Sequence, residues 1–146
     1  MVRSIVAVIA GCIVAVIVIM AFEAAGLIIW PPPKELSEVL KDPALFKKLQ
    51  SEPETLRALM AQIPVAAFLN VLAAHAAGCF VGGWLATRIA KSARVLPGLI
   101  VGALMTLCGI ANLMAIPHPL WFTVTDVLIY LPLAFVGAKV AVRKDS

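Results

Sequence analysis

A few polar side chains lie inside long apolar stretches of this sequence, where ionisable groups are costly and usually face other protein groups. At about 1.5 Å per helical residue, four of them fall about 7 to 10 Å from one end of their stretch. These four are Glu23, Asn70, Asn112 and Asp126. They form a predicted polar layer, with His118 just above it and His75 about a turn and a half deeper.

The predicted layer contains two carboxyl groups, and no Lys or Arg occurs at its depth. Two full negative charges cannot coexist unaided in apolar surroundings. Glu23 and Asp126 are therefore expected to be protonated, to share a proton or to hold an imported cation. We predict that the layer carries at least one proton near neutral pH and titrates as a coupled unit.

Three interpretations of the layer stay open. In the first, the polar groups bond one another and fix the register of the helices, because an unpartnered polar group in apolar surroundings is costly. In the second, they form a proton or cation pathway or a small-ligand site. The third is a divalent metal held by His118, Glu23 and Asp126, which is disfavoured because their spacing is not diagnostic. No metal and no cofactor is predicted.

Nucleophilic catalysis is weakly indicated. Cys79 follows His75 by one helical turn, and such a pair can form a thiolate–imidazolium couple. Apolar surroundings disfavour that charged couple, so His75 is interpreted as a hydrogen-bonded core residue. Cys12 and Cys108 also lie in apolar stretches and are expected to be small packing residues. No catalytic residue is predicted, and a non-enzymatic protein is favoured.

The elements that must position these residues follow from composition. The 146 residues are 62% apolar and 14% charged, whereas soluble proteins are about half apolar. Four apolar stretches, at about 4–30, 63–87, 96–116 and 120–142, approach or exceed the ~20 residues that cross a bilayer. Backbone polar groups in lipid must be satisfied within the segment. The sequence therefore predicts an all-α polytopic membrane protein, with a four-transmembrane-helix bundle that forms a single domain over residues 1–146.

Small residues recur at helical spacing in these stretches, and in a bilayer they allow neighbouring helices to approach backbone to backbone. The second stretch has them at intervals of four, and the third has a seam with steps of four and three. The predicted packing residues are Gly78, Gly82, Ala86, Gly98, Gly102 and Gly109.

Residues 31–62 form the hydrophilic part of the chain. A proline triplet at 31–33 ends the first helix. Asp42 before Pro43 predicts an N-cap, and Ser51 to Glu54 predicts a capping box with Pro53 in the first turn. We expect an amphipathic hairpin on the outer membrane face. The alternative is a lid over a site between the helices.

Basic residues indicate the orientation. Seven lie in short segments at one side, and five lie in the loop 31–62. The seven are Arg3, Arg88, Lys91, Arg94, Lys139, Arg143 and Lys144. Short basic segments at helix ends stay on the cytoplasmic side, so both termini are predicted to be cytoplasmic. The net charge of +4 fits this topology and contact with anionic lipids, and no nucleic-acid partner is predicted.

Three segments carry a resemblance: the proline triplet, AHAAGCFVGGWLATRIA in the second stretch, and GIANLMAIPHPLWF before the fourth. Together they resemble an uncharacterised group of small four-span bacterial membrane proteins, over most of the chain. PHPLWF is the most distinctive part. The resemblance implies a four-helix fold and a location in the bacterial plasma (inner) membrane, and it implies no activity.

Three function classes remain. The favoured one is a small non-enzymatic membrane protein that acts as an accessory or an oligomer-forming subunit. The alternative is a proton- or cation-coupled transporter or channel that uses the polar layer. The third is a membrane enzyme that acts on a lipid head group. The expected partners are the lipid bilayer and either a second copy or another membrane protein.

Overall fold

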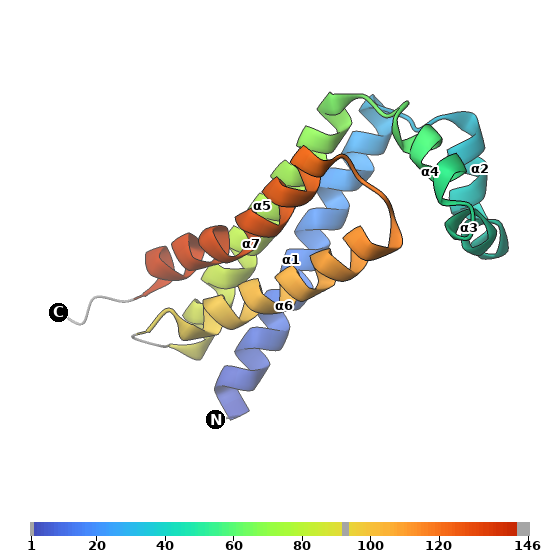
Figure 1. Ribbon diagram of the computed structural model, residues 1–146. Coiled ribbons are helices and arrows are strands. Elements are labelled where there is room, and N and C mark those ends of the chain that lie inside the picture. The colour runs from blue at the N-terminus through green and yellow to red at the C-terminus, as the bar shows by residue number, and fades with distance from the viewer. Residues whose placement is uncertain (1, 92–93, 143–146) are drawn as a thin grey trace.

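The computed structural model describes residues 2–91 and 94–142, and within them it contains seven helices and no strand (Figure 1). Four helices are long: α1 (Val2–Ile29), α5 (Val65–Ala90), α6 (Leu96–Ala115) and α7 (Leu120–Ala141). Each is long and apolar enough to cross a membrane. The prediction of an all-α chain with four long apolar helices is confirmed, with ends no more than three residues from the predicted ones.

Helix α5 lies in the middle of the long helices and packs against α1, α6 and α7. α1 presents one narrow stripe to it, because the buried residues of α1 recur mostly at intervals of four. The stripe consists of Ala7, Gly11, Ala15, Ile19 and Gly26. The large side chains between these positions, such as Ile9 and Ile13, are exposed. α1 therefore contacts the protein along one edge only.

α1 and α5 touch backbone to backbone where two glycines meet. A Cβ atom built on Gly11 would lie 2.7 Å from the carbonyl oxygen of Gly82. One built on Gly82 would lie 2.6 Å from the carbonyl oxygen of Gly11. No side chain fits between carbonyl groups at this separation, so glycine on both helices sets how closely they approach.

Helix α7 lies close to both α5 and α6. A Cβ on Gly83 of α5 would lie 2.5 Å from the Ala134 carbonyl oxygen, and one on Gly109 of α6 would lie 2.5 Å from the Tyr130 hydroxyl. All nine glycines of the sequence lie in the four long helices and are buried. The bundle thus depends on close helix contact rather than on large interlocking side chains.

Three short helices connect α1 to α5: α2 (Lys34–Lys41), α3 (Pro43–Gln50) and α4 (Pro53–Met60). The loop is thus a three-helix unit rather than a hairpin. The side chain of Asp42 accepts from the amides of Ala44 and Leu45, so the predicted N-cap of α3 is confirmed.

The capping box predicted at Ser51 to Glu54 is wrong. α3 ends at Gln50, and Ser51 closes it by donating its hydroxyl to the carbonyl oxygen of Lys48, 2.5 Å away. The N-cap of α4 is instead Glu52, which makes no side-chain capping bond. Pro53 does occupy the first turn.

The three short helices share an apolar core with the first turns of α5 and α7. Leu36, Leu49, Leu56 and Met60 cluster with Phe68, Leu72 and Phe122. Gln50 donates its side-chain amide to the carbonyl oxygen of Ala115, 3.3 Å away at the end of α6. Both contacts hold the short helices at one end of the bundle.

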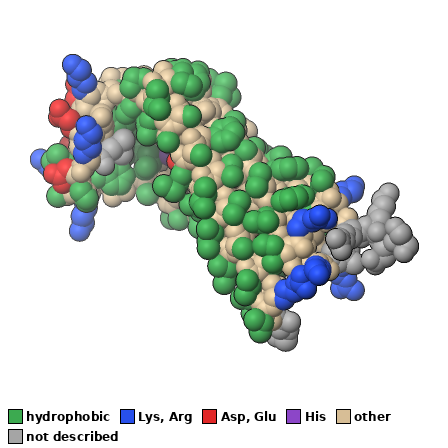
Figure 2. Space-filling model, turned by 180° about the vertical axis from the view of Figure 1, so that it is seen from behind, with side chains coloured by type: hydrophobic (Ala, Val, Ile, Leu, Met, Phe, Trp, Pro, Cys, Tyr) green, Lys and Arg blue, Asp and Glu red, His purple; other side chains and the backbone are tan. Residues whose placement is uncertain are grey.

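The start of α1 and the end of α7 lie at the opposite end from the short helices (Figure 1). There Arg3 donates from Nε to the carbonyl oxygen of Ile89, 2.7 Å away, which ties α1 to the last turn of α5. Basic side chains gather at this end (Figure 2). Arg143 and Lys144, which also counted toward the predicted orientation, lie outside the described residues.

Gly82 offers a direct test of this packing. Gly→Ala usually stabilises a helix by about 1 kcal/mol, but here the added Cβ would meet the Gly11 carbonyl oxygen. We predict that Gly82→Ala destabilises the protein, and that Gly82→Leu does so more, by ~1–3 kcal/mol or more.

The measurement is thermal unfolding in detergent, with Ala73→Leu as the control because Ala73 is exposed on the same helix. A Gly82→Leu protein as stable as Ala73→Leu would show that α1 does not occupy this groove.

Candidate functional site

A hydrogen-bonded cluster of polar side chains lies between α5 and α7. Nδ1 of His75 lies 2.5 Å from Oδ1 of Asp126 and 2.9 Å from the Tyr130 hydroxyl. The same hydroxyl donates to Oδ2 of Asp126 over 2.9 Å. Both oxygens of Asp126 are thus bonded, which matches its burial, since only 1% of this residue is exposed.

Glu23 of α1 extends the cluster on the other side of the imidazole. Its Oε1 lies 3.7 Å from Nε2 of His75, beyond the length of a hydrogen bond but close enough for an ion pair. The Glu23 side chain is 42% exposed. The cluster therefore runs from a half-exposed carboxyl group through a buried imidazole to a fully buried carboxyl group.

Helix direction explains why these side chains meet. Side chains lean toward the N-terminus of their own helix. α1 runs toward the short helices and α5 runs away from them. The Glu23 side chain therefore leans away from the short helices, and the His75 side chain leans toward them. Asp126 and Tyr130 are four residues apart on α7 and share a face.

The prediction that His75 lies deeper than the carboxyl groups is wrong, because His75 lies between them. Depth counted along each helix from its end ignores the opposite lean of α1 and α5. The carboxyl groups therefore have an ionisable partner that can become cationic. Tyr130 belongs to the same cluster and was not predicted there, although its spacing from Asp126 was the available signal.

The two asparagines of the predicted layer line cavities beside Glu23, but neither forms a hydrogen bond with this cluster within the described part of the chain. Asn70 donates from Nδ2 to the carbonyl oxygen of Phe22, 3.1 Å away, and so ties α5 to α1. A Cβ on Gly26 would collide with the Asn70 amide. Asn112 is exposed. The predicted layer of four residues is thus replaced by Glu23, His75, Asp126 and Tyr130, which we name the His75 cluster.

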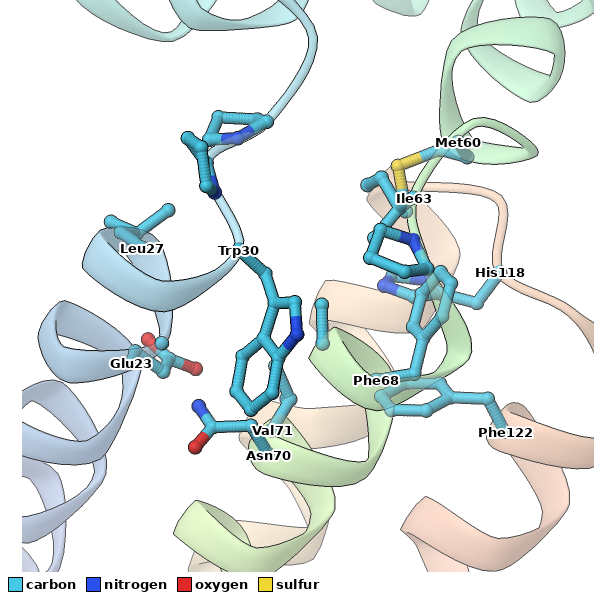
Figure 3. Close-up of a pocket in the computed structure, with 15 residues that line it drawn as sticks. Glu23, Leu27, Trp30, Met60, Ile63, Phe68, Asn70, Val71, His118 and Phe122 are labelled. Carbon is cyan, nitrogen blue, oxygen red and sulfur yellow. The ribbon is translucent and has the colours of Figure 1, made fainter.

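Two cavities border the His75 cluster at Glu23. The first, of about 230 Å³, lies between α1, α5 and the short helices (Figure 3). It is lined mainly by apolar and aromatic side chains, including Trp30, Phe68 and Phe122, with Asn70 and His118 as further polar groups. The second, of about 210 Å³, is lined by Glu23, His75 and Tyr130 with Met105 and Asn112 of α6.

His118 lies in the turn between α6 and α7, not in the His75 cluster. Its ring stacks on Phe122 with the centroids 4.9 Å apart, and its Nδ1–H donates to the carbonyl oxygen of Ile116 over 2.7 Å. Burial lowers the pKa of His118 and outweighs the opposing effect of that backbone bond. His118 is therefore neutral near pH 7, with Nε2 as an acceptor.

The geometry gives little support to a metal site or to a nucleophilic couple of Cys79 and His75. Within residues 2–91 and 94–142, no group of three His, Cys, Asp or Glu side chains could hold a metal ion. His75 directs Nδ1 at Asp126 and Nε2 at Glu23, so neither nitrogen is directed at Cys79. Cys79 itself is fully buried.

The lowered pKa of His118 predicts a loss of stability in acid. The folded protein binds fewer protons at His118 than the unfolded chain once the pH falls below its ordinary value of 6.5. The stability due to neutral His118 is complete above that value and is lost as the pH falls toward the lowered pKa. His118→Phe keeps the ring stacking and removes the titration.

We expect the melting temperature of the wild type to fall more steeply than that of His118→Phe between about pH 8 and about pH 5. Parallel curves would mean that His118 is not buried as described.

Comparisons with known proteins identify no family for this chain. No protein-family model matches the chain, and neither the curated proteins nor the solved structures contain a match. The resemblance to small four-span membrane proteins stays a prediction.

Proposed function

We propose that this protein is a non-enzymatic accessory protein of the bacterial plasma membrane, which binds a proton at the His75 cluster from the extracytoplasmic side only. Its four long helices span the bilayer, with both termini in the cytoplasm. The observation that carries the proposal is the chain of a half-exposed Glu23, a buried His75 and a buried Asp126.

The surface supports placement in a bilayer. Large apolar side chains are exposed along all four long helices, among them Ile17 on α1, Leu69 on α5, Leu107 on α6 and Leu128 on α7. They cover the bundle between two ends that carry the charged groups (Figure 2). Apolar exposure of this extent is typical of a surface that faces lipid.

The proton-exchange step is supported by the bonds of the cluster. The Tyr130 hydroxyl donates to one oxygen of Asp126, and a carboxylate only accepts, so Nδ1–H of His75 donates to the other. The proton that can be exchanged is then one carried by Nε2 of His75 or by Glu23, which lie 3.7 Å apart as an ion pair. Glu23 is the member of the cluster that borders both cavities.

The inner half of the bundle supports one-sided access. Further from the short helices, the buried side chains between the long helices are small or apolar. They include Gly78, Cys79, Gly82, Ala86, Val101, Gly102, Ala134 and Ala138. The buried hydroxyl of Thr87 has no hydrogen-bond partner among the described residues. A transport pathway would need polar groups through this region, so the geometry favours binding over transport.

The arrangement also favours a non-enzymatic role. A catalytic imidazole presents one nitrogen to the substrate. Nε2 of His75 faces Glu23 instead, and only 8% of His75 is exposed. Both ring nitrogens of His75 are thus directed at carboxyl groups rather than at a position for a substrate.

Proton binding by the cluster predicts a loss of stability at alkaline pH. Without protons the folded protein would hold two carboxylates in apolar surroundings, with no Lys or Arg among the described residues that line the two cavities. Loss of the bound proton would leave both carboxylates beside a neutral imidazole, so we expect stability to fall as the pH rises. Glu23→Gln with Asp126→Asn removes both carboxylates and keeps polar groups at these sites.

We expect the wild type to melt at progressively lower temperature from about pH 6 to about pH 9, and the double variant to change little. Glu38→Gln, at an exposed position on α2, should behave like the wild type. Reconstituted wild type should show no proton flux across vesicles. Equal pH dependence of wild type and double variant would refute the proposal, and flux abolished by the double variant would establish the transporter instead.

The proposed topology predicts which side each end of the bundle faces. In a background with Cys12, Cys79 and Cys108 changed to Ala, single cysteines replace Ser51 at the short helices and Lys91 at the other end. An impermeant thiol reagent added outside spheroplasts should label Ser51→Cys only. Labelling of Lys91→Cys would show that the orientation is reversed or that the helices do not all span.

A further inference from the structure

The first cavity is lined by three polar side chains that can accept hydrogen bonds. Asn70 donates one amide N–H to the carbonyl oxygen of Phe22, and its Oδ1 is an acceptor. His118 donates Nδ1–H to the carbonyl oxygen of Ile116, so its Nε2 is an acceptor. Glu23 contributes carboxylate oxygens. A ligand that bonds the acceptor atoms of these three side chains must donate hydrogen bonds.

The cavity also favours positive charge. Trp30 lies between Glu23 and the group of Phe68, Phe122 and His118 (Figure 3). Aromatic faces attract cations, most strongly when water is excluded. None of the described residues that line this cavity is Lys or Arg. The neighbouring cationic group is His75, whose Nε2 stands 3.7 Å from Glu23, too far to saturate that carboxylate with hydrogen bonds.

The remaining walls are apolar. Leu27, Met60, Ile63 and Val71 line the cavity together with the aromatic side chains. A volume of about 230 Å³ suits a small organic molecule rather than a bare ion. The ligand should therefore join a donor-bearing cationic head to an apolar body.

We propose that the first cavity binds an organic ammonium cation, with its N–H groups directed at Glu23, Asn70 and His118 and its apolar part against Trp30 and Phe68. This inference rests on the proposed function, because Glu23 is both the open end of the His75 cluster and the main anionic group of the cavity. The ammonium group has two sources, a free aliphatic amine or the headgroup of an aminophospholipid. The experiment separates them.

The test uses the full-length protein in nanodiscs of phosphatidylglycerol, with octylammonium as the probe and the melting temperature as the readout. Ligands that bind only the folded state raise the melting temperature in a saturable way. A charge-assisted contact of this kind contributes about tenfold or more in affinity. We expect octylammonium to stabilise the wild type, and Glu23→Gln to need at least about tenfold more of it.

Three controls make the test specific. Glu38→Gln, which keeps Glu23 and removes an exposed acid, should respond like the wild type. Octyltrimethylammonium, which lacks N–H donors, should bind more weakly than octylammonium, and octanoate should not stabilise. In nanodiscs that contain phosphatidylethanolamine, a weakened response to added octylammonium identifies the lipid headgroup as the occupant. An unchanged response identifies a free amine.

The same shift in the wild type and in Glu23→Gln, an equal shift with octanoate, or no shift at all would overturn the proposal. These outcomes are independent of the alkaline melting series, which contains no amine. Failure of the ammonium site would thus leave proton binding by the His75 cluster standing.

Discussion

The placement of an imidazole between two carboxyl groups, inside a bundle with few other polar groups, constrains the rest of this structure. His75, Asp126 and Glu23 come from three different helices, and each must lie within a few ångströms of the next. Such closeness requires that α5 approach both α1 and α7 without intervening side chains. Gly82 against Gly11, and Gly83 against Ala134, provide it through direct backbone contact. The glycine contacts and the polar cluster therefore depend on each other: changing a glycine would move the helices and break the bonds of the cluster.

The two halves of the bundle differ in the residues that they contain. The half away from the short helices is packed largely from Gly, Ala, Val and Cys, with Thr87 as a buried polar residue. The half next to them carries the His75 cluster, two cavities and the aromatic group of Phe68, His118 and Phe122, covered at one end by α2, α3 and α4. Such a division is compatible with the proposed binding of a proton from one side only. The three short helices form one apolar cluster with Phe68 and Phe122. They therefore lie beside the first cavity.

Much of the fold was predictable because its physical causes are local. Apolar stretches long enough for a bilayer, a proline triplet and an Asp–Pro pair mark helices by composition and capping alone. The site was less accessible. Glu23 and Asp126 were found because charge in an apolar stretch is rare, but His75 was placed too deep. Its contact with them depends on the opposite lean of side chains on antiparallel helices, and on how far each helix is shifted along its neighbour. Neither the relative lean nor the shift can be derived from a single stretch of sequence. Asn112, assigned to the layer by depth, is exposed because depth does not define which way a helix face turns.

Nδ1–H of His75 is held by Asp126 inside the bundle, and ¹⁵N spectroscopy of histidine-labelled protein in lipid tests this contact most directly. The sequence has two histidines, so His118→Phe leaves the signals of His75 alone. We predict a protonated, strongly hydrogen-bonded Nδ1 whose signal persists across neutral pH and shifts when Asp126 is changed to Asn. A free imidazole that titrates near its ordinary value of about 6.5 and ignores Asp126→Asn would contradict it.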